Sequence, residues 1–324
     1  MTPHESLRSA GESAPVAASP AGRRRVPMLK SVLAPVALAA LAVGLVACGT
    51  QTAGGSGAKN TGSKGRPSSS TSSSSTTTTI PVALRPLPQP TAARPMTILE
   101  VGDSLGEDLG IGMGTVFANN PLVKVIQASH GDSGLARPDF YNWPSVLGTE
   151  LQRYHPAAVV VLIGGNDGQS FNYGNGVVSW GSAQWHTVYS QRVATFMEAA
   201  LKAHVKVLWV GLPIMQDPSF WREMATQNAI YKAEAASHPG VTYFDSAHVF
   251  ENSAGQYADT LPVNGQAELV RDSDGVHITI NYGADLIAES IIPVMEHAWG
   301  INLVPPANAG GSAGSGTGNT GSGG

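Results

Sequence analysis

Five short stretches of the chain have the apolar pattern of β-strands, and longer amphipathic stretches separate them. The central one, residues 157–163, is apolar on both faces, which is typical of a strand buried in a parallel sheet. The predicted strands are 96–101, 123–128, 157–163, 205–210 and 241–244. Apolar residues near helical spacing predict helices over 184–204, 219–236 and 282–299. Strands that alternate with helices predict a three-layer α/β/α sandwich around a central parallel sheet.

The segments on either side of this region have compositions that disfavour a packed core. Residues 49–96 are rich in Ser, Thr and Pro, and residues 306–324 are a Gly-rich tail without a charge. We therefore expect a disordered tether over 48–96, a folded domain over 97–305 and a disordered tail over 306–324. The roughly 210 residues of the predicted domain are ample for one core.

The N-terminal segment, residues 1–47, has the pattern of an export signal. Basic residues precede 17 uncharged residues that run from Ser31 to Ala47. The segment Leu45–Cys48 resembles a bacterial lipobox, in which the cysteine is diacylated and becomes the first residue of the mature chain. This interpretation predicts a protein anchored through lipid on Cys48 to the outer face of the bacterial cytoplasmic membrane. Ordinary signal cleavage and retention of the apolar run as an anchor are the alternatives, and the export route is open.

Composition excludes several classes of protein. Cys48 is the only cysteine among 324 residues, so an intramolecular disulfide framework and cysteine-built zinc or iron–sulfur sites are excluded. A net charge of −4 argues against a nucleic-acid binder. Residues 1–96 hold 10 of the 19 basic residues and 2 of the 23 acidic ones, so the rest of the chain carries a net charge of −12. No two histidines have a metal-binding spacing such as H-E-x-x-H, and we expect neither a metal nor a cofactor.

Residues with catalytic chemistry follow the predicted strands. Ser104 follows the first strand and Asn166 the third, while Asp274 and His277 precede the last helix. Ligands bind at the carboxyl ends of strands in such folds, so these residues are expected in one site. A serine hydroxyl needs a base, a histidine has a suitable pKa, and a carboxylate fixes the tautomer of that histidine. The N–H of Ser104 and the amide of Asn166 are candidates to stabilise an oxyanion.

The order of these blocks resembles the SGNH (GDSL) hydrolase family. The Ser block corresponds to residues 102–105, the G-x-N-D block to residues 164–167 and the D-x-x-H block to residues 274–277. Residues 102–106 also match the G-x-S-x-G elbow of α/β-hydrolases, but several strands precede the nucleophile there, and the disordered tail matches this motif too. The resemblance covers the predicted domain and implies a flavodoxin-like sheet.

The resemblance implies a catalytic triad. Ser104 would be the nucleophile, His277 the base and Asp274 its carboxylate partner. Ser133, in a second Gly-Asp-Ser triplet, competes with Ser104, and Asp272 competes with Asp274.

The resemblance also implies an oxyanion hole built from three donors. These would be the N–H of Ser104, the side chain of Asn166 and a glycine N–H after the second strand. Gly134 is the best match for the glycine, and Gly131 is its rival.

Each of these residues has a structural alternative. Ser104 or Asp274 could cap a helix, and Asn166 and Asp167 could be turn residues. The aromatic-rich segments 139–143 and 172–185 either line the site or pack into the core.

Location and family resemblance together imply an exported serine esterase that hydrolyses O-acyl, mainly acetyl, esters through an acyl-enzyme. Its partner would be an acylated cell-envelope glycan or another small ester, with the membrane contacted through the N-terminal lipid. An O-acetyltransferase with the same triad is one alternative. A catalytically inactive wall-binding or scaffold protein is the other.

Overall fold

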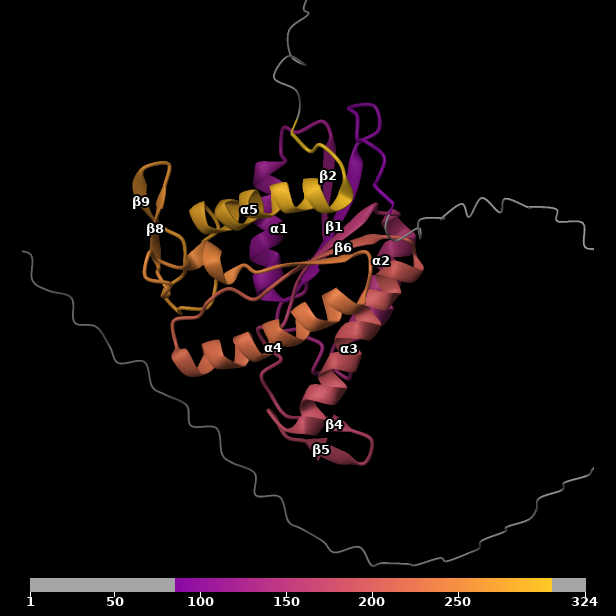
Figure 1. The fold of residues 1–324 in the computed structure, drawn as a ribbon, viewed down its shortest axis with the longest axis vertical. Coiled ribbons are helices and arrows are strands. Elements are labelled where there is room, and N and C mark those ends of the chain that lie inside the picture. The colour runs from indigo at the N-terminus through magenta and orange to yellow at the C-terminus, as the bar shows by residue number, and fades with distance from the viewer. Residues whose placement is uncertain (1–84, 305–324) are drawn as a thin grey trace, which may run out of the picture. The chain divides into compact units, whose positions relative to one another are not determined.

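The central feature of the computed structural model, which describes residues 85–304, is a sheet of five parallel strands (Figure 1). The strand order is β2-β1-β3-β6-β7, the flavodoxin-like order for five strands taken along the chain. The strands are β1 (Met96–Gly102), β2 (Val123–Gln127), β3 (Ala158–Leu162), β6 (Lys206–Val210) and β7 (Val241–Phe244). The predicted leader, residues 48–84 of the predicted tether and the predicted tail lie outside the described residues. The prediction of a disordered tether as far as residue 96 is wrong for its last part, because Met96 begins β1 and the N–H of Leu87 donates to the carbonyl of Trp299 at 2.9 Å.

Five α-helices cover the two faces of this sheet. Helices α1 and α5 lie on one face, and α2, α3 and α4 lie on the other (Figure 1). The helices are α1 (Ser104–Val116), α2 (Trp143–Tyr154), α3 (Ala183–Lys202), α4 (Pro218–Ser237) and α5 (Tyr282–Trp299), with a 3-10 helix η2 (Ala247–Phe250). The predicted three-layer α/β/α sandwich with a parallel sheet is confirmed.

Strand β3 lies at the centre of the core because both of its neighbours and both helical layers cover it. All five of its residues are buried. It pairs with β1 from Ile98 opposite Ala158 to Gly102 opposite Leu162, so both strands end at the same edge of the sheet. Burial of each large apolar side chain stabilises the fold by about 1.5–3 kcal/mol. The uninterrupted apolar run of β3 therefore fixes the sheet that positions the site.

Helix α1 forms although four of its residues are glycines. Each glycine costs a helix roughly 1 kcal/mol relative to alanine. At Gly112 a Cβ would lie 2.0 Å from the carbonyl oxygen of Ala284 in α5, so glycine permits the close approach of the two helices. Packing against α5 and the sheet thus offsets the low helix propensity of this segment.

Two small antiparallel hairpins were not predicted. One pairs β4 (Phe171–Tyr173) with β5 (Gly176–Val178), and the other pairs β8 (Thr260–Val263) with β9 (Gln266–Leu269). The first lies beside the start of α3 and the second beside the start of α5 (Figure 1). Asn264 and Gly265 turn the second hairpin with φ of 51° and 80°, the conformation of a two-residue type I′ turn.

Within residues 85–304, no helix has the length and apolarity needed to cross a bilayer.

Candidate active site

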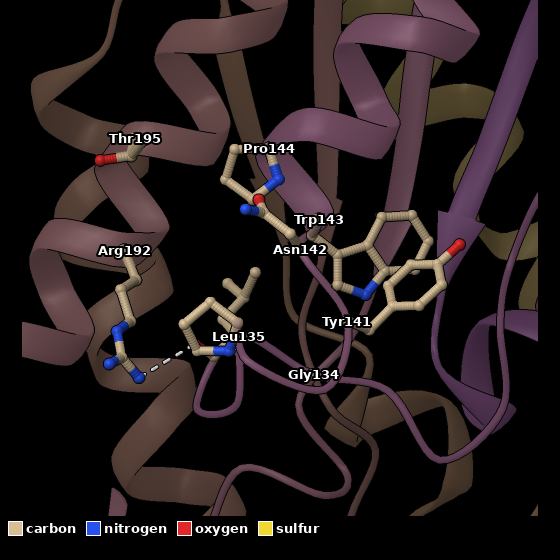
Figure 2. Close-up of a pocket in the computed structure, with 9 residues that line it drawn as sticks. Gly134, Leu135, Tyr141, Asn142, Trp143, Pro144, Arg192 and Thr195 are labelled. Atoms are coloured by element: carbon tan, nitrogen blue, oxygen red, sulfur yellow. Dashed lines mark hydrogen bonds between the residues drawn. The ribbon is translucent and has the colours of Figure 1, made fainter. Parts of the chain in front are cut away.

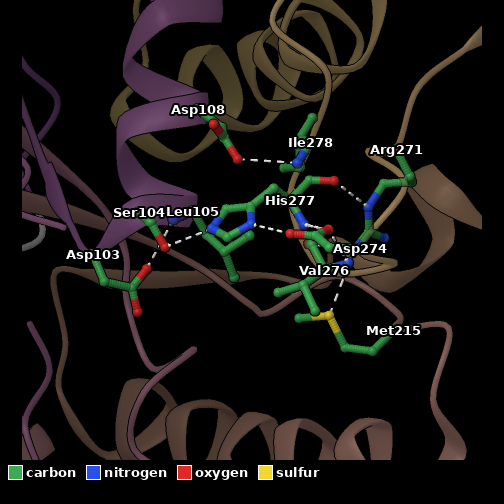
Figure 3. Close-up of polar contacts among 10 residues, drawn as sticks. All are labelled: Asp103, Ser104, Leu105, Asp108, Met215, Arg271, Asp274, Val276, His277 and Ile278. Atoms are coloured by element: carbon green, nitrogen blue, oxygen red, sulfur yellow. Dashed lines mark hydrogen bonds and ion pairs between the residues drawn. The ribbon is translucent and has the colours of Figure 1, made fainter. Parts of the chain in front are cut away.

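Ser104, His277 and Asp274 form one chain of hydrogen bonds (Figure 3). Ser104 Oγ lies 2.9 Å from His277 Nε2, and His277 Nδ1 lies 2.6 Å from Asp274 Oδ2. Ser104 is the first residue of α1, directly after β1, whereas the other two lie in the loop before α5. The fold thus brings Ser104 into contact with a pair of side chains that lies more than 150 residues later in the sequence.

The three-residue spacing of Asp274 and His277 is built into a turn. Asp274 Oδ1 accepts hydrogen bonds from the backbone N–H groups of Val276, at 2.8 Å, and His277, at 3.0 Å. Its other oxygen is left for the imidazole. The proposed capping role of Asp274 is wrong, because α5 begins after Asn281. One carboxylate therefore shapes the loop and orients the histidine.

The contact between Asp274 and His277 also shifts the pKa of both side chains. Burial opposes the charged imidazolium, but the hydrogen bond and charge of Asp274 outweigh it and raise the pKa of His277 above its ordinary value. Burial likewise opposes ionisation of Asp274, but its hydrogen bonds to His277 and Val276 lower its pKa to about 2. Asp274 is therefore ionised at neutral pH, as a carboxylate that stabilises an imidazolium must be.

Arg271 holds the loop that carries Asp274 and His277. Its side chain is fully buried and donates from Nη2 to the carbonyl of Val276, at 2.6 Å, and from Nη1 to that of Ile214, at 2.5 Å. Its guanidinium also lies over the rings of Phe250 and Tyr257. Burial lowers the pKa of Arg271 to about 10. No role was predicted for this residue, because most of its partners lie on other elements.

Asp108 ties the same loop to α1. Its Oδ2 accepts the backbone N–H of Ile278 at 3.0 Å, next to His277 (Figure 3). Burial raises the pKa of Asp108 to about 6. Ser104 and Asp108 are four residues apart and therefore share one face of α1. The helix that carries Ser104 thus also fixes the loop that carries His277.

The two rivals of the triad residues occupy structural positions. Ser133 is fully buried, and its Oγ donates to the carbonyl of His130, at 2.5 Å, and accepts from Trp143 Nε1, at 3.0 Å. The backbone N–H of Asp272 donates to the carbonyl of His277 at 2.9 Å, which helps to close the loop. The carboxylate that contacts the imidazole of His277 is that of Asp274.

Asp103, not Ser104, caps α1, so the helix-capping alternative for Ser104 is wrong. Asp103 Oδ1 accepts the N–H of Leu105 at 3.0 Å. Its Oδ2 accepts the N–H groups of Gly164, at 2.8 Å, and Gly165, at 2.7 Å. Burial raises the pKa of Asp103 to about 7. This carboxylate joins the turn after β1 to the turn after β3, and the preference of aspartate for helix N-caps was the sequence signal for it.

Gly134 and Asn166 lie together in the structure. Both line a cavity of about 190 Å³, together with Asp132, Ser133, Arg137, Phe140, Asp167 and Gln169. Asn166 Nδ2 donates to the carbonyl of Ser133 at 3.0 Å, which joins the turn after β3 to the loop after β2. The N–H of Ser104 is at the start of a helix, where N–H groups have no intrahelical partner.

The structure distinguishes Gly134 from its rival Gly131. The N–H of Gly131 donates to Glu107 Oε1 at 2.8 Å, so it is already used. Within residues 85–304 the N–H of Gly134 donates no hydrogen bond. Gly134 therefore keeps the donor that an oxyanion needs.

Asp167 holds the backbone that follows Gly134. Its two oxygens accept the N–H of Leu135, at 2.8 Å, and of Ala136, at 2.7 Å. The hydroxyl of Tyr189 donates to it at 2.7 Å. Asp167 is buried, and burial raises its pKa. It is also a turn residue, because its N–H donates to the carbonyl of Gly164 at 2.9 Å. The sequence indicated the turn but not the contacts of the side chain.

The aromatic-rich segments divide between core and surface. Trp185 lies in the first turn of α3 and is fully buried, with Nε1 donating to the carbonyl of Gln169 at 2.9 Å. Trp143 is buried against Ser133. Phe140 is 59% exposed beside the cavity that contains Gly134. Of these rings, only that of Phe140 is available to a ligand at this cavity.

The chain belongs to the family DUF459, described as a protein of unknown function, which it matches over residues 97–294. No curated protein matches the chain. A GDSL-like lipase from Bacteroides thetaiotaomicron is similar, with a TM-score of 0.46 and 18% identity over 65% of this chain and 93% of that one. A variant of an acetyl-xylooligosaccharide esterase from Geobacillus has a TM-score of 0.43 and 13% identity over 65% and 97% of the two chains. The esterase EstA from Pseudoalteromonas has a TM-score of 0.40 and 14% identity over 62% and 98%.

Proposed function

We propose that the chain is a serine esterase of the SGNH type. The observation that carries this proposal is the hydrogen-bonded chain from Ser104 Oγ through His277 to Asp274, with distances of 2.9 Å and 2.6 Å. A hydroxyl, an imidazole and an ionised carboxylate in this order form the arrangement that activates a serine nucleophile. Ser104 and His277 are both only partly buried, so an ester can reach them.

The reaction proceeds in two halves. Ser104 Oγ attacks the ester carbonyl while His277 Nε2 takes the hydroxyl proton, and the N–H groups of Ser104 and Gly134 and the amide of Asn166 stabilise the oxyanion. Collapse of the tetrahedral intermediate breaks the bond to the alcohol, which leaves with the proton from His277. Water then attacks the acyl group on Ser104, with His277 again as base, and the carboxylic acid is released.

Exposure of the triad favours hydrolysis over transfer. The side chains of His277 and Asp274 are 37% and 49% exposed, so bulk water has access to the acyl-enzyme. A transferase that used the same triad would have to exclude that water until an acceptor hydroxyl bound.

The substrate we propose is an O-acetyl ester of a cell-envelope glycan. The cavity at Gly134 and Asn166 has a volume of about 190 Å³ and a mixed polar and apolar lining, which suits a short acyl group or a sugar. The exposed ring of Phe140 on its rim offers an apolar face to a sugar ring. Export and anchoring through lipid on Cys48 would place the enzyme beside such glycans.

The first test is turnover of a small acetyl ester by the purified chain and by Ser104→Ala. We expect wild-type turnover that the substitution abolishes. Turnover that survives in Ser104→Ala would refute the assignment of the nucleophile, and absence of wild-type turnover would refute the esterase.

The second test offers the enzyme an acetylated envelope polymer with and without a deacetylated glycan acceptor. Free acetate in both reactions supports the esterase, whereas acetylated acceptor identifies a transferase. Mass spectrometry of the mature N-terminus tests the anchor, since we expect a lipid on Cys48, and an unmodified end at another residue would refute it.

A further inference from the structure

Two side chains of helix α3, one turn apart, hold the loop that carries Gly134. Tyr189 does so through Asp167, and Arg192 contacts the loop directly. Tyr189 is fully buried, and its hydroxyl donates to Asp167 Oδ2 at 2.7 Å. Asp167 in turn accepts the N–H groups of Leu135 and Ala136. The hydroxyl of Tyr189 therefore acts on the loop through one buried carboxylate.

Arg192 contacts the backbone carbonyls of the same two residues. Its Nη1 donates to the carbonyls of Leu135, at 3.2 Å, and Ala136, at 2.6 Å. Figure 2 shows the side chain extending from α3 toward Leu135. The guanidinium of Arg192 lies over the ring of Phe171 in β4, 4.0 Å from the ring centroid. This cation–π contact helps to hold the guanidinium in place.

The two residues that follow Gly134, Leu135 and Ala136, are therefore each held at both of their backbone polar groups. Asp167 accepts their N–H groups, and Arg192 donates to their carbonyls. The peptide unit between Leu135 and Ala136 is planar and is held at its carbonyl and at its N–H, so the direction of the chain that follows Gly134 is fixed. The N–H of Gly134 has no partner within residues 85–304, and the chain on both sides of it sets its direction. Asn166 holds the carbonyl of Ser133 in the same peptide unit, and Asp167 and Arg192 hold the two residues that follow.

We propose that Tyr189 and Arg192 are positioning residues that aim the N–H of Gly134 at the oxyanion. This inference rests on the proposed esterase function. The hydrogen bonds described for these two side chains include none to Ser104 or His277, so they act through the backbone of residues 134–136. Because that backbone carries a transition-state donor, they contribute to kcat more than to ground-state binding.

Kinetics of Tyr189→Phe and Arg192→Met in the full chain, with p-nitrophenyl acetate as substrate, test the proposal. A displaced catalytic group costs up to about 100-fold in rate, so we expect kcat to fall roughly 10- to 100-fold and KM to stay within about 2-fold. The affinity for a trifluoromethyl ketone, which forms an oxyanion on Ser104, should fall by a similar factor. Because both side chains act on the backbone of the same two residues, the double variant should lose less than the product of the two single losses.

Active-site titration with a fluorophosphonate normalises kcat to the folded enzyme. Arg192→Gln keeps a donor and should give an intermediate kcat, so the proposal stays testable if Arg192→Met does not fold. Tyr154→Phe and Arg153→Met, at the end of α2, are the matched controls and should keep the wild-type kcat.

The outcomes separate the two proposals. A wild-type chain without turnover refutes the esterase itself. Turnover that depends on Ser104, with kcat of Tyr189→Phe and Arg192→Met within 2-fold of the wild type, overturns the positioning roles alone. A rise in KM without a fall in kcat also overturns them.

Discussion

Replacement of Gly134 by alanine places a methyl group against the carboxylate of Asp167. The added Cβ would lie 2.1 Å from Asp167 Oδ1, about 1.3 Å short of the 3.4 Å at which ordinary contact begins. Asp167 cannot yield freely, because it is buried and holds Leu135, Ala136 and Tyr189. The backbone at Gly134 must therefore move by about an ångström, and its N–H with it.

A shift of that size removes most of the benefit of an oxyanion donor. Displacement by 1 Å costs up to about 100-fold in rate, and loss of one oxyanion donor costs roughly 100- to 1,000-fold in kcat. We expect Gly134→Ala to lower kcat by about 100-fold, corresponding to about 2.7 kcal/mol of transition-state stabilisation.

Steady-state turnover of p-nitrophenyl acetate, normalised by active-site titration, measures this loss. Gly131→Ala and Gly148→Ala are matched controls, because the added Cβ would lie 3.4 Å from Glu107 or more than 4 Å from any neighbour. Both should keep the wild-type kcat, and Gly148→Ala should stabilise helix α2 by up to about 1 kcal/mol. A kcat of Gly134→Ala within 2-fold of the wild type would refute the placement of the Gly134 N–H at the oxyanion.

Three further predictions follow from the same contacts. The rate constant kcat/KM should rise with pH through the raised pKa of His277, because the base must be unprotonated, and a flat profile between pH 5 and 8 would contradict this role. Asp274→Asn removes the partner that raises the pKa of His277, so the midpoint of the pH profile should move to lower pH while kcat falls on the order of 1,000- to 10,000-fold. An unmoved midpoint would show that a group other than Asp274 sets the pKa of the base. Ser133→Ala leaves Trp143 Nε1 without its acceptor, so the free energy of unfolding in urea should fall by about 1–3 kcal/mol while kcat stays within 2-fold of the wild type. Loss of turnover without loss of stability would instead make Ser133 the candidate nucleophile.

The sheet and the contact of His277 with Asp274 and Ser104 could be predicted from the sequence because their signals are local. Strand β3 is a continuous apolar run, the other strands of the sheet are rich in apolar residues, and each strand prediction agrees with the structure within one residue at either end. The Asp274–His277 spacing likewise reflects a turn closed by neighbouring N–H groups. Such features depend on residues a few positions apart.

The supporting residues could not be predicted because their partners are distant in the sequence. Arg271 contacts Ile214, Asp108 contacts Ile278, and α3 contacts the loop after β2. These pairs depend on the packing of whole elements. Two omissions had local signals, however: Asn264-Gly265 indicates a hairpin turn, and Asn142 before Pro144 indicates the start of α2. The four glycines of α1 disfavour a helix in the sequence, and packing against α5 and the sheet explains why the helix forms.

The most direct test of Ser104 as an activated nucleophile is peptide mapping by mass spectrometry after reaction with a fluorophosphonate. A fluorophosphonate forms a covalent bond with a serine whose hydroxyl a neighbouring histidine activates. The contacts of Ser104 and His277 predict one adduct per chain, on the peptide that contains Ser104, and none in Ser104→Ala. An unlabelled wild-type chain, or an adduct on the peptide that contains Ser133, would contradict it.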